Sequence, residues 1–571
     1  MRLNPYNSFR IGGQAQGILL LLILVAGLLC FAQYGISWDE QTQRNSGIVF
    51  FNHIQETFNL HPVTIPAGVP NLEDYRDREF GASFETFLFG LERLLGFNDY
   101  KQVFLFRHLV NFLFFWLGVM VFGTAVKSFF RRPILPIAGC LILFLHPRIF
   151  ADSFYNSKDI ILMVFFIFSF RAFLVFNESW KIRHGAWFAL LSALAFNIRP
   201  AGILIPMLAA LVMLPAAIRQ IRNHMEKHRL IALIFYILFF ILFVWLTNPY
   251  LWDNPFAKSY QVITKFLKYD VSHTAGNLLF MGKYMPTNSL PWYYLPAWIG
   301  VTTPVVYLLL ILPGVIVMVR RVVAKVETGR DLPGKRILFY TAGWLFLPLL
   351  TAIIFHSTLY DGWRHFYFIW PAMVLAGLYG FDAMLDLYFL RFRETVKKSI
   401  KLFTIAALVL SWVATSLFIY RCHPHQYSYF NILAPDPARN FELDYWGLSY
   451  RDGLNDLVKR NPSGNISVRV LNLPGYLNAF LLEPGDRDRF WYHHSLQEDY
   501  SSRIDSYFPF RSGPHILEQG KEVKYYISNF RDTSSPDELE KYRKGLSPYT
   551  GQVFSCMVDN LEILGVYQLQ P

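Results

Sequence analysis

The chain has 571 residues, of which 53% are hydrophobic and only 16% charged. With a mean hydropathy of +0.28, it has too little polar surface for a soluble globule of this size, so the composition indicates a membrane protein. The formal net charge of +12 is explained by membrane topology and attraction to anionic headgroups, and it does not indicate nucleic-acid binding.

Apolar runs long enough to cross a bilayer recur along the first 420 residues. A spanning helix needs about 20 mostly apolar residues, because the hydrocarbon core is roughly 30 Å thick and cannot hydrate backbone groups. We predict a polytopic α-helical membrane protein with about eleven transmembrane helices. The third and fifth runs are short, and re-entrant or tilted elements are the alternative for them. The predicted spans are 17–36, 103–126, 134–147, 158–176, 185–199, 200–218, 230–248, 296–319, 337–355, 366–384 and 402–420.

Basic residues in alternate connections set the predicted orientation. Lys and Arg near the ends of spans are retained on the cytoplasmic side. The N-terminus is then inside, and an odd number of spans places the C-terminal region outside. The basic connections contain Lys127, Arg131 and Arg132; Lys181 and Arg183; Arg219, Arg222, Lys227 and Arg229; Arg320, Arg321, Lys325, Arg330, Lys335 and Arg336; and Arg391, Arg393, Lys397, Lys398 and Lys401.

Hydropathy falls after residue 420, which predicts a transmembrane domain over 1–420 and a small external α/β domain over 421–571. Cys422 and Cys556 both lie in this second domain, where a disulfide is chemically allowed, but sequence does not fix their pairing. Strands are predicted at 466–471 and 523–527, helices at 448–460 and 536–545, and a closing hairpin at 553–569. External loops are predicted at 37–102, 249–295 and 356–365, with an amphipathic interfacial helix at 84–95.

Two adjacent acids, Asp39 and Glu40, follow the first apolar run. A carboxylate is the usual group that deprotonates a hydroxyl, so both are candidate catalytic residues. The alternative is an interfacial helix cap with an acidic first turn.

A second polar group surrounds the start of the fourth predicted span. The Lys158 ammonium is suited to phosphate oxygens, and the carboxylates of Asp152 and Asp159 are suited to a sugar hydroxyl or a divalent metal. Capping of the span is the alternative for Asp152.

Further ionisable residues lie on the same predicted side. Arg199, at a span end before Pro200, either binds phosphate or extends to the interface. Arg364 is a candidate phosphate clamp, and Asp361 and His365 are candidate substrate-binding residues, although this stretch also fits an ordinary solvated turn. The aromatic segment 441–447 is suited either to stacking on a sugar or to an aromatic belt at the headgroups.

Nucleotide and metal motifs are missing from the sequence. It contains no His-Glu-x-x-His or paired-Cys pattern, no Walker loop and no dinucleotide fingerprint. We therefore expect no cofactor and assign no metal ligand, although a divalent metal stays possible. An external enzyme without a nucleotide site needs an already activated donor, and a lipid-phosphate sugar is such a donor.

The order and sidedness of these motifs resemble the GT-C superfamily of polytopic glycosyltransferases, in particular the branch with the protein O-mannosyltransferases and the bacterial aminoarabinose transferase for lipid A. The resemblance implies inverting transfer of a sugar from a polyprenyl-phosphate donor to a hydroxyl of a protein, lipid or glycan acceptor. The reaction would occur at the external face of a bacterial inner membrane. Asp39 would be the base with Glu40 supporting it, and Lys158, Arg199 and Arg364 would hold the leaving phosphate. Because no clean Asp-x-Asp occurs in the first loop, we favour metal-independent catalysis. The matching segments are Trp38-Asp39-Glu40, 75–96, 146–159, 197–200 and 360–365.

Two other function classes remain open, a transporter or flippase and a non-catalytic assembly protein. A transporter would also place charges in a helical bundle, but transporters often show internal repeats and broken helices at the midplane. This sequence shows no internal duplication, and its charges lie at one predicted face.

Overall fold

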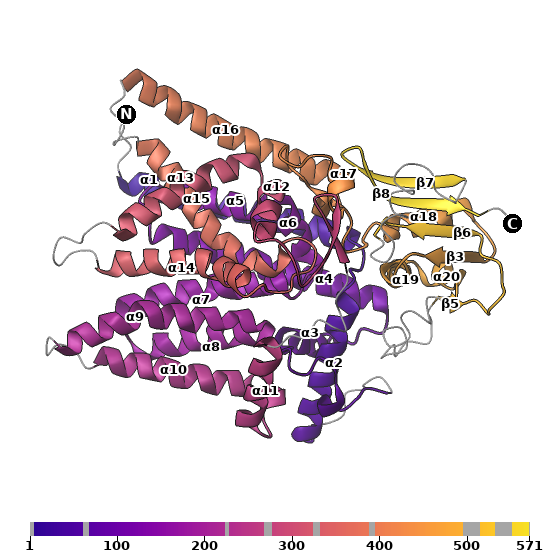
Figure 1. The fold of residues 1–571 in the computed structure, drawn as a ribbon, viewed down its shortest axis with the longest axis horizontal. Coiled ribbons are helices and arrows are strands. Elements are labelled where there is room, and N and C mark those ends of the chain that lie inside the picture. Colours follow the sequence, from indigo (N-terminus) through magenta and orange to yellow (C-terminus); the bar gives the residue numbers. More distant parts are fainter. Residues whose placement is uncertain are drawn as a thin grey trace.

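The computed structural model describes residues 5–60, 68–222, 228–267, 277–323, 332–386, 394–494, 514–531 and 551–569. A helical bundle forms most of the molecule, and a smaller domain with a sheet sits at one end of it (Figure 1). The predicted fold class, a polytopic helical membrane protein with a C-terminal α/β domain, is confirmed.

Eight helices in the described residues are long and apolar enough to cross a membrane, or nine if a bent pair is one span. The predicted count of eleven is not confirmed, because α8 (Ile182–Ile198) has only 17 residues, and η3 (Pro200–Ile203) with α9 (Leu204–Arg222) contains only a shorter apolar stretch. The eight are α1 (Pro5–Cys30), α4 (Tyr100–Lys127), α7 (Asp159–Ser179), α10 (His228–Leu246), α13 (Val305–Val323), α14 (Leu332–Ile354), η6 (Arg364–Ile369) with α15 (Trp370–Asp386), and α16 (Glu394–Arg421).

The bent pair is the third predicted span. Helix α5 (Ile134–Phe144) and helix α6 (Pro147–Tyr155) meet at an angle of 67°. Pro147 lies at the start of α6, where its missing N–H costs nothing, whereas it could not continue α5 without losing a hydrogen bond. Every residue of α6 is buried, so this element lies inside the protein.

Close helix packing in the bundle uses glycine. A Cβ on Gly314 of α13 would lie 1.7 Å from the carbonyl oxygen of Ala376 in α15, so only glycine permits this approach. Small residues at such crossings let helix backbones approach closely in a membrane.

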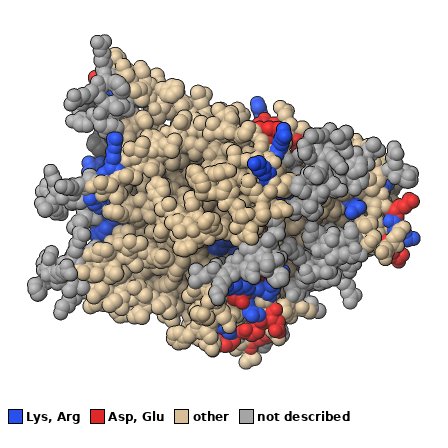
Figure 2. Space-filling view, in the orientation of Figure 1, with Lys and Arg blue, Asp and Glu red and all other residues tan. Residues whose placement is uncertain are grey.

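Charge is distributed unevenly between the two ends of the bundle. Figure 2 shows Lys and Arg at the left end, mixed acidic and basic residues at the lower right, and a broad band of other residues between them. Figure 1 shows the sheet domain at the right of the view, and α2 (Glu40–Thr57), α3 (Ser83–Leu94) and α11 (Pro255–Leu267) at the lower right of the bundle. The remaining described elements before α13 are η1 (Phe31–Gln33), η2 (Leu72–Asp74), η4 (Pro249–Leu251), the hairpin of β1 (Asn277–Phe280) and β2 (Lys283–Pro286), and α12 (Tyr294–Thr302).

The predicted amphipathic helix corresponds to α3, but its apolar face is divided between two environments. Phe84 and Leu88 are buried in the protein, whereas Leu94 and Leu95 are exposed. The helix therefore packs on the protein with its first turns and presents apolar side chains outward at its last turn.

The C-terminal domain is a six-stranded mixed sheet with the order β5-β4-β3-β6-β8-β7. The pairs β5–β4, β4–β3 and β3–β6 are parallel, and β6–β8 and β8–β7 are antiparallel. The predicted strands at 466–471 and 523–527 and the closing hairpin are present, whereas the predicted helix at 536–545 lies outside the described residues. The elements are η7 (Gln426–Ser428), α17 (Pro437–Asn440), α18 (Tyr450–Arg460), β3 (Ile466–Val470), α19 (Pro474–Leu477), η8 (Asn478–Leu481), α20 (Pro484–Arg487), β4 (Phe490–Tyr492), β5 (His515–Ile516), β6 (Tyr525–Ser528), β7 (Gln552–Val558) and β8 (Leu561–Gln568).

The C-terminal domain shares a hydrophobic core with the segment that follows α1 and with the first turns of α4. Ile36, Tyr100 and Phe104 belong to the same buried cluster as residues of α18, β3 and β8. The side chain of Asn478 accepts a hydrogen bond from the backbone N–H of Ile36 and donates one to its carbonyl. The segment that leads to Asp39 is thus fixed against this domain.

Candidate active site

A chain of ion pairs crosses the end of the bundle that carries the C-terminal domain. Arg364 Nη1 lies 3.2 Å from Asp39 Oδ2 and 3.1 Å from Asp159 Oδ2. Asp159 Oδ1 lies 2.8 Å from Arg199 Nη2. Four of the predicted site residues, which are up to 325 positions apart in the sequence, are therefore direct neighbours.

Accessibility differs along this chain. The side chains of Asp159 and Arg364 are 1% and 6% exposed, whereas those of Arg199 and Asp39 are 23% and 32% exposed. Asp39 and Arg199, at the two ends of this chain of ion pairs, are therefore open to a ligand. The buried residues Asp159 and Arg364 between them hold them in place.

Local backbone features explain the position of Arg199. Helix α8 ends at Ile198, and Arg199 has an extended backbone with φ −149° and ψ 141°. The following proline disfavours helical geometry at this residue. Arg199 therefore leaves the helix axis at the end of α8, and its guanidinium reaches Asp159, the first residue of α7.

Asn156 connects the two acids of the neighbouring segment. Its side-chain Nδ2 donates to Asp159 Oδ2 at 3.0 Å and to Asp152 Oδ2 at 3.3 Å, and its Oδ1 accepts from the Asp159 N–H at 2.9 Å. Asp152 also accepts a hydrogen bond from the Trp446 indole N–H at 3.0 Å. The predicted substrate residue Asp152 thus fixes an aromatic ring of the C-terminal domain over the bundle.

Arg364 is held by aromatic residues as well as by carboxylates. Its Nη2 donates to the Tyr445 hydroxyl at 2.8 Å, and its guanidinium carbon lies 4.7 Å from the centre of the Trp446 ring. Gly362 permits the preceding turn, because it has a φ of +75° and lies against Tyr427. Both Nη groups of Arg364 are engaged, while its Nε has no hydrogen-bond partner among the described residues.

Lys158 supplies a further positive charge. Its ammonium lies 5.3 Å from the centre of the Phe80 ring, and no carboxylate of the described residues lies within ion-pair distance of it. Burial, and after it the nearby charge of Arg199, lowers the pKa of Lys158 to about 8. An arriving anion would offset both costs.

Glu40 lies beside Asp39 in sequence but has different contacts. Its carboxylate accepts from the Ser37 backbone N–H at 2.6 Å and lies 2.8 Å from His108 Nε2, and it is buried. Asp39 makes no such capping bond with its side chain. The capping interpretation fits in part: Asp39 occupies the N-cap position of α2 without a side-chain capping bond, and Glu40 is the acid of the first turn.

Asp361 and His365 lie at the edge of the same region. Asp361 pairs with Arg531 at 3.6 Å, and burial raises the pKa of Asp361. The His365 ring lies edge-on to Tyr360, with centroids 5.5 Å apart. Among the described residues, neither Asp361 nor His365 forms a hydrogen bond or an ion pair with Asp39.

Two residues of this region were not singled out from the sequence. Asn156 lies within the segment 146–159, but its uncharged amide does not distinguish it as a site residue in the sequence. Arg531 lies 4.4 Å from the Tyr445 ring and 5.3 Å from the Trp38 ring, and it belongs to the C-terminal domain, where charged residues are common. No sequence signal identifies it.

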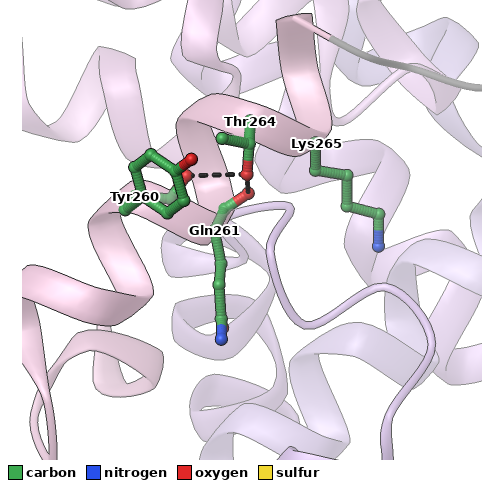
Figure 3. Close-up of a pocket in the computed structure, with 4 residues that line it drawn as sticks. All are labelled: Tyr260, Gln261, Thr264 and Lys265. Carbon is green, nitrogen blue, oxygen red and sulfur yellow. Dashed lines mark hydrogen bonds between the residues drawn. The ribbon is translucent and has the colours of Figure 1, made fainter.

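A shallow pocket on α11 borders this region. It is lined by Tyr260, Gln261, Thr264 and Lys265, with the Lys265 side chain directed away from the other three (Figure 3). The Lys265 ammonium lies 5.4 Å from the Phe80 ring, which also borders Lys158. Phe80 thus has two cations near its ring.

Comparisons with known proteins identify structural neighbours only. No protein-family model matches the chain, and no curated protein matches it. The apo structure of ArnT from Cupriavidus metallidurans is similar over 98% of this chain and 100% of that chain, with 11% identity and a TM-score of 0.47. The archaeal oligosaccharyltransferase AglB from Archaeoglobus fulgidus is similar over 92% of this chain and 70% of that chain, with 11% identity and a TM-score of 0.45.

A third neighbour is the arabinofuranosyltransferase AftD from mycobacteria, with 11% identity, a TM-score of 0.40, and coverage of 97% of this chain and 40% of that chain. These neighbours are GT-C glycosyltransferases. Because all three TM-scores are below 0.5, function has to be inferred from the geometry of the site.

Proposed function

We propose that this protein is a membrane glycosyltransferase, which transfers a sugar from a polyprenyl-phosphate donor to an acceptor hydroxyl at the external face of the membrane. One observation carries the proposal. A partly exposed carboxylate, Asp39, is held by Arg364 within a chain of charges that ends at the partly exposed Arg199, and Lys158 lies beside this chain. This arrangement supports the proposal of a base and an anion site at one end of the bundle.

The donor phosphate would bind at the basic end of this chain. The Nε groups of Arg199 and Arg364 have no hydrogen-bond partner among the described residues, and Lys158 has no ion pair there. A lipid-linked sugar phosphate carries negative charge at headgroup depth, and Arg199 and Lys158 lie where α8 ends and α7 begins. Arginine and lysine both bind phosphate oxygens through charge-assisted hydrogen bonds.

The reaction would be a single displacement at the anomeric carbon. The acceptor oxygen forms a bond to this carbon while the bond from carbon to phosphate oxygen breaks. The electron pair leaves on the lipid phosphate beside Arg199 and Lys158, and the hydroxyl proton passes to Asp39. Attack opposite the leaving group inverts the configuration. Glu40 acts indirectly, since its bond to the Ser37 N–H fixes the loop that carries Asp39.

The sugar would lie under the aromatic residues of the C-terminal domain. Trp446 is fixed by Asp152, and Tyr445 is fixed by Arg364. Aromatic faces suit the apolar faces of sugars, and carboxylates suit their hydroxyls. We assign Asp152, Asp159, Asp361 and His365 to substrate positioning. In this proposal no metal takes part in the transfer step.

The test is sugar transfer by the full-length protein in nanodiscs. Sugars linked to undecaprenyl phosphate and to dolichol phosphate are suitable donors, because an ArnT structure and an AglB structure contain these lipid phosphates. Asp39→Asn keeps the shape and removes the base, so transfer should fall about 10²–10⁴-fold. Asp253→Asn is the control, because Asp253 pairs with Lys258 at an exposed position. Equal activity of Asp39→Asn and wild type would exclude Asp39 as the base, and flux without a covalent product would indicate a transporter.

A further inference from the structure

The junction between the last span and the sheet domain brings together three potential metal ligands. His425 follows α16, Asp452 lies in the first turn of α18, and Cys556 lies in β7. One ligand atom from each lies within 4.8 Å of the other two. His425 and Cys556 are buried and Asp452 is partly exposed, so the group is closed on the protein side and open through the carboxylate.

We propose that His425, Asp452 and Cys556 bind a transition-metal ion of the zinc type. An imidazole nitrogen, a thiolate and a carboxylate oxygen suit zinc, whereas calcium and magnesium prefer oxygen ligands alone. The fourth position of a tetrahedral ion would face the exposed side of Asp452, where water can fill it. This site is distinct from the ion-pair chain that contains Asp39.

The distances within the group fit an ion after a small movement. Asp452 Oδ2 lies 2.7 Å from His425 Nε2 and 3.8 Å from Cys556 Sγ. Zinc bond lengths of about 2.0 Å to nitrogen and oxygen and 2.3 Å to sulfur place tetrahedral ligands ~3.3 Å and ~3.6 Å apart. The distance from sulfur to the carboxylate oxygen is therefore close to the required value, and the nitrogen and oxygen must separate by about 0.6 Å. The side chain of Asp452, which is 36% exposed, has room to turn.

Neighbouring contacts give the ion a structural role. Arg451, next to Asp452, donates from Nη1 to the carbonyls of Ala32 and Tyr34 at 2.8 Å. Gln426, next to His425, accepts a hydrogen bond from the Tyr34 hydroxyl at 2.9 Å. An ion joining these segments would fix the exit of the first span, which leads directly to Asp39. Binding displaces the thiol proton of Cys556 and the proton shared by His425 and Asp452.

A disulfide between Cys422 and Cys556 is the competing use of the same thiol. All four cysteines of the chain are free in the structure, and the metal requires Cys556 as a thiolate. A disulfide at Cys556 and a metal ion bound by Cys556 therefore exclude each other. The variant Cys422→Ser distinguishes the two, because it abolishes the disulfide and keeps all three proposed metal ligands.

The experiment measures metal bound by the full-length protein in nanodiscs after chelation and titration with Zn²⁺. We expect one zinc per chain by mass spectrometry of the metal, and a thiolate-to-cobalt absorption band when Co²⁺ replaces zinc. Cys556→Ser, His425→Gln and Asp452→Asn should each weaken zinc binding by at least ~100-fold, more than loss of an outer-shell partner. Cys422→Ser should bind zinc as the wild type does.

Three results would overturn the proposal: a wild-type protein that binds no zinc, zinc binding that is unchanged in Cys556→Ser, or a Cys422–Cys556 disulfide in the purified protein. The cobalt spectrum of the wild type needs no variant, so a failure of any variant to fold leaves the test intact. Sugar transfer is not its readout, so the outcome is independent of the proposed function.

Discussion

Two ionic networks lie at the same end of the bundle and differ in accessibility. In the first, Glu92 pairs with Arg44 at 3.0 Å and with Arg107 at 2.8 Å, and Glu85 also pairs with Arg107. Its side chains are at most 6% exposed, with two positive and two negative charges. The second is the chain from Asp39 to Arg199, which has exposed ends and Lys158 beside it.

The difference separates a structural role from a chemical one. Arg44 lies 5.7 Å from the Tyr100 ring and has no access to solvent, so no ligand can reach the first network. It joins α2, α3 and α4, and Glu85 extends it to the Ser157 hydroxyl, one residue before Lys158. The closed network of Glu85, Glu92, Arg44 and Arg107 thus stabilises the segment 157–159. This segment contributes Lys158 and Asp159 to the open network.

Breaking the closed network should give the largest effect on stability. Glu92→Gln leaves Arg44 and Arg107 buried without their shared counter-charge, which should cost about 3–5 kcal/mol of unfolding free energy. The measurement is thermal unfolding in nanodiscs followed by tryptophan fluorescence. Glu73→Gln is the control, because Glu73 pairs with Lys258 and is 53% exposed, and it should cost only about 0.2–1 kcal/mol. Equal unfolding temperatures for Glu92→Gln and Glu73→Gln would contradict the structural role of the buried network.

Breaking the open network at its basic end should mainly affect ligand binding. Arg199→Gln removes a charged donor to the phosphate, worth about 1.5–3 kcal/mol or roughly 10–150-fold in affinity. The measurement is binding of a polyprenyl phosphate to the protein in nanodiscs. Lys101→Gln is the matched control, since Lys101 pairs with Glu483 on another part of the same end. Unchanged binding by Arg199→Gln would remove Arg199 from the anion site.

A smaller effect should follow from pH. Burial lowers the pKa of Lys158 to about 8, so the ammonium is charged below this pH and loses its proton as pH rises through it. The nearby charges of Arg199, Asp77, Glu85 and Asp39 act on the same group. Binding of a polyprenyl phosphate should weaken about tenfold per pH unit above ~8, because the fraction of charged Lys158 falls about tenfold per unit there. The charge of the phosphate does not change in this range, since it titrates near pH ~6.

Lys158→Arg tests the assignment of this pH dependence, since arginine keeps its charge throughout the range. Binding by this variant should stay nearly constant to higher pH. If wild type and variant lose affinity in parallel, another group controls the pH profile.

The sequence predicts the open network better than the closed one. Asp39, Lys158 and Arg199 are recognisable because each stands beside an apolar run, where a charge is costly. Glu85 and Glu92 lie in an amphipathic loop helix, where acids are ordinary, so only the fold reveals their partners. The metal-ligand group could not be predicted, because His425 and Asp452 are 27 positions apart and Cys556 follows 104 positions after Asp452.

The number of spans was less predictable than their positions. Hydropathy locates apolar runs, but it does not show that Pro147 turns α6 back into the protein or that α8 stops short at the residue before Arg199. Both breaks place polar residues at the site, so the departures from ideal spans are where the candidate chemistry lies.

The shared core of the C-terminal domain has a consequence for how the chain is made. Ile36, Tyr100 and Phe104 are packed by residues that begin at Leu443, so more than half of the polypeptide is synthesised between the two halves of this contact. These early apolar side chains therefore lack their packing partners until the end of the chain has been made. Chains cut short before that point would keep Ile36, Tyr100 and Phe104 uncovered, and we expect this region of them to be open to proteolysis.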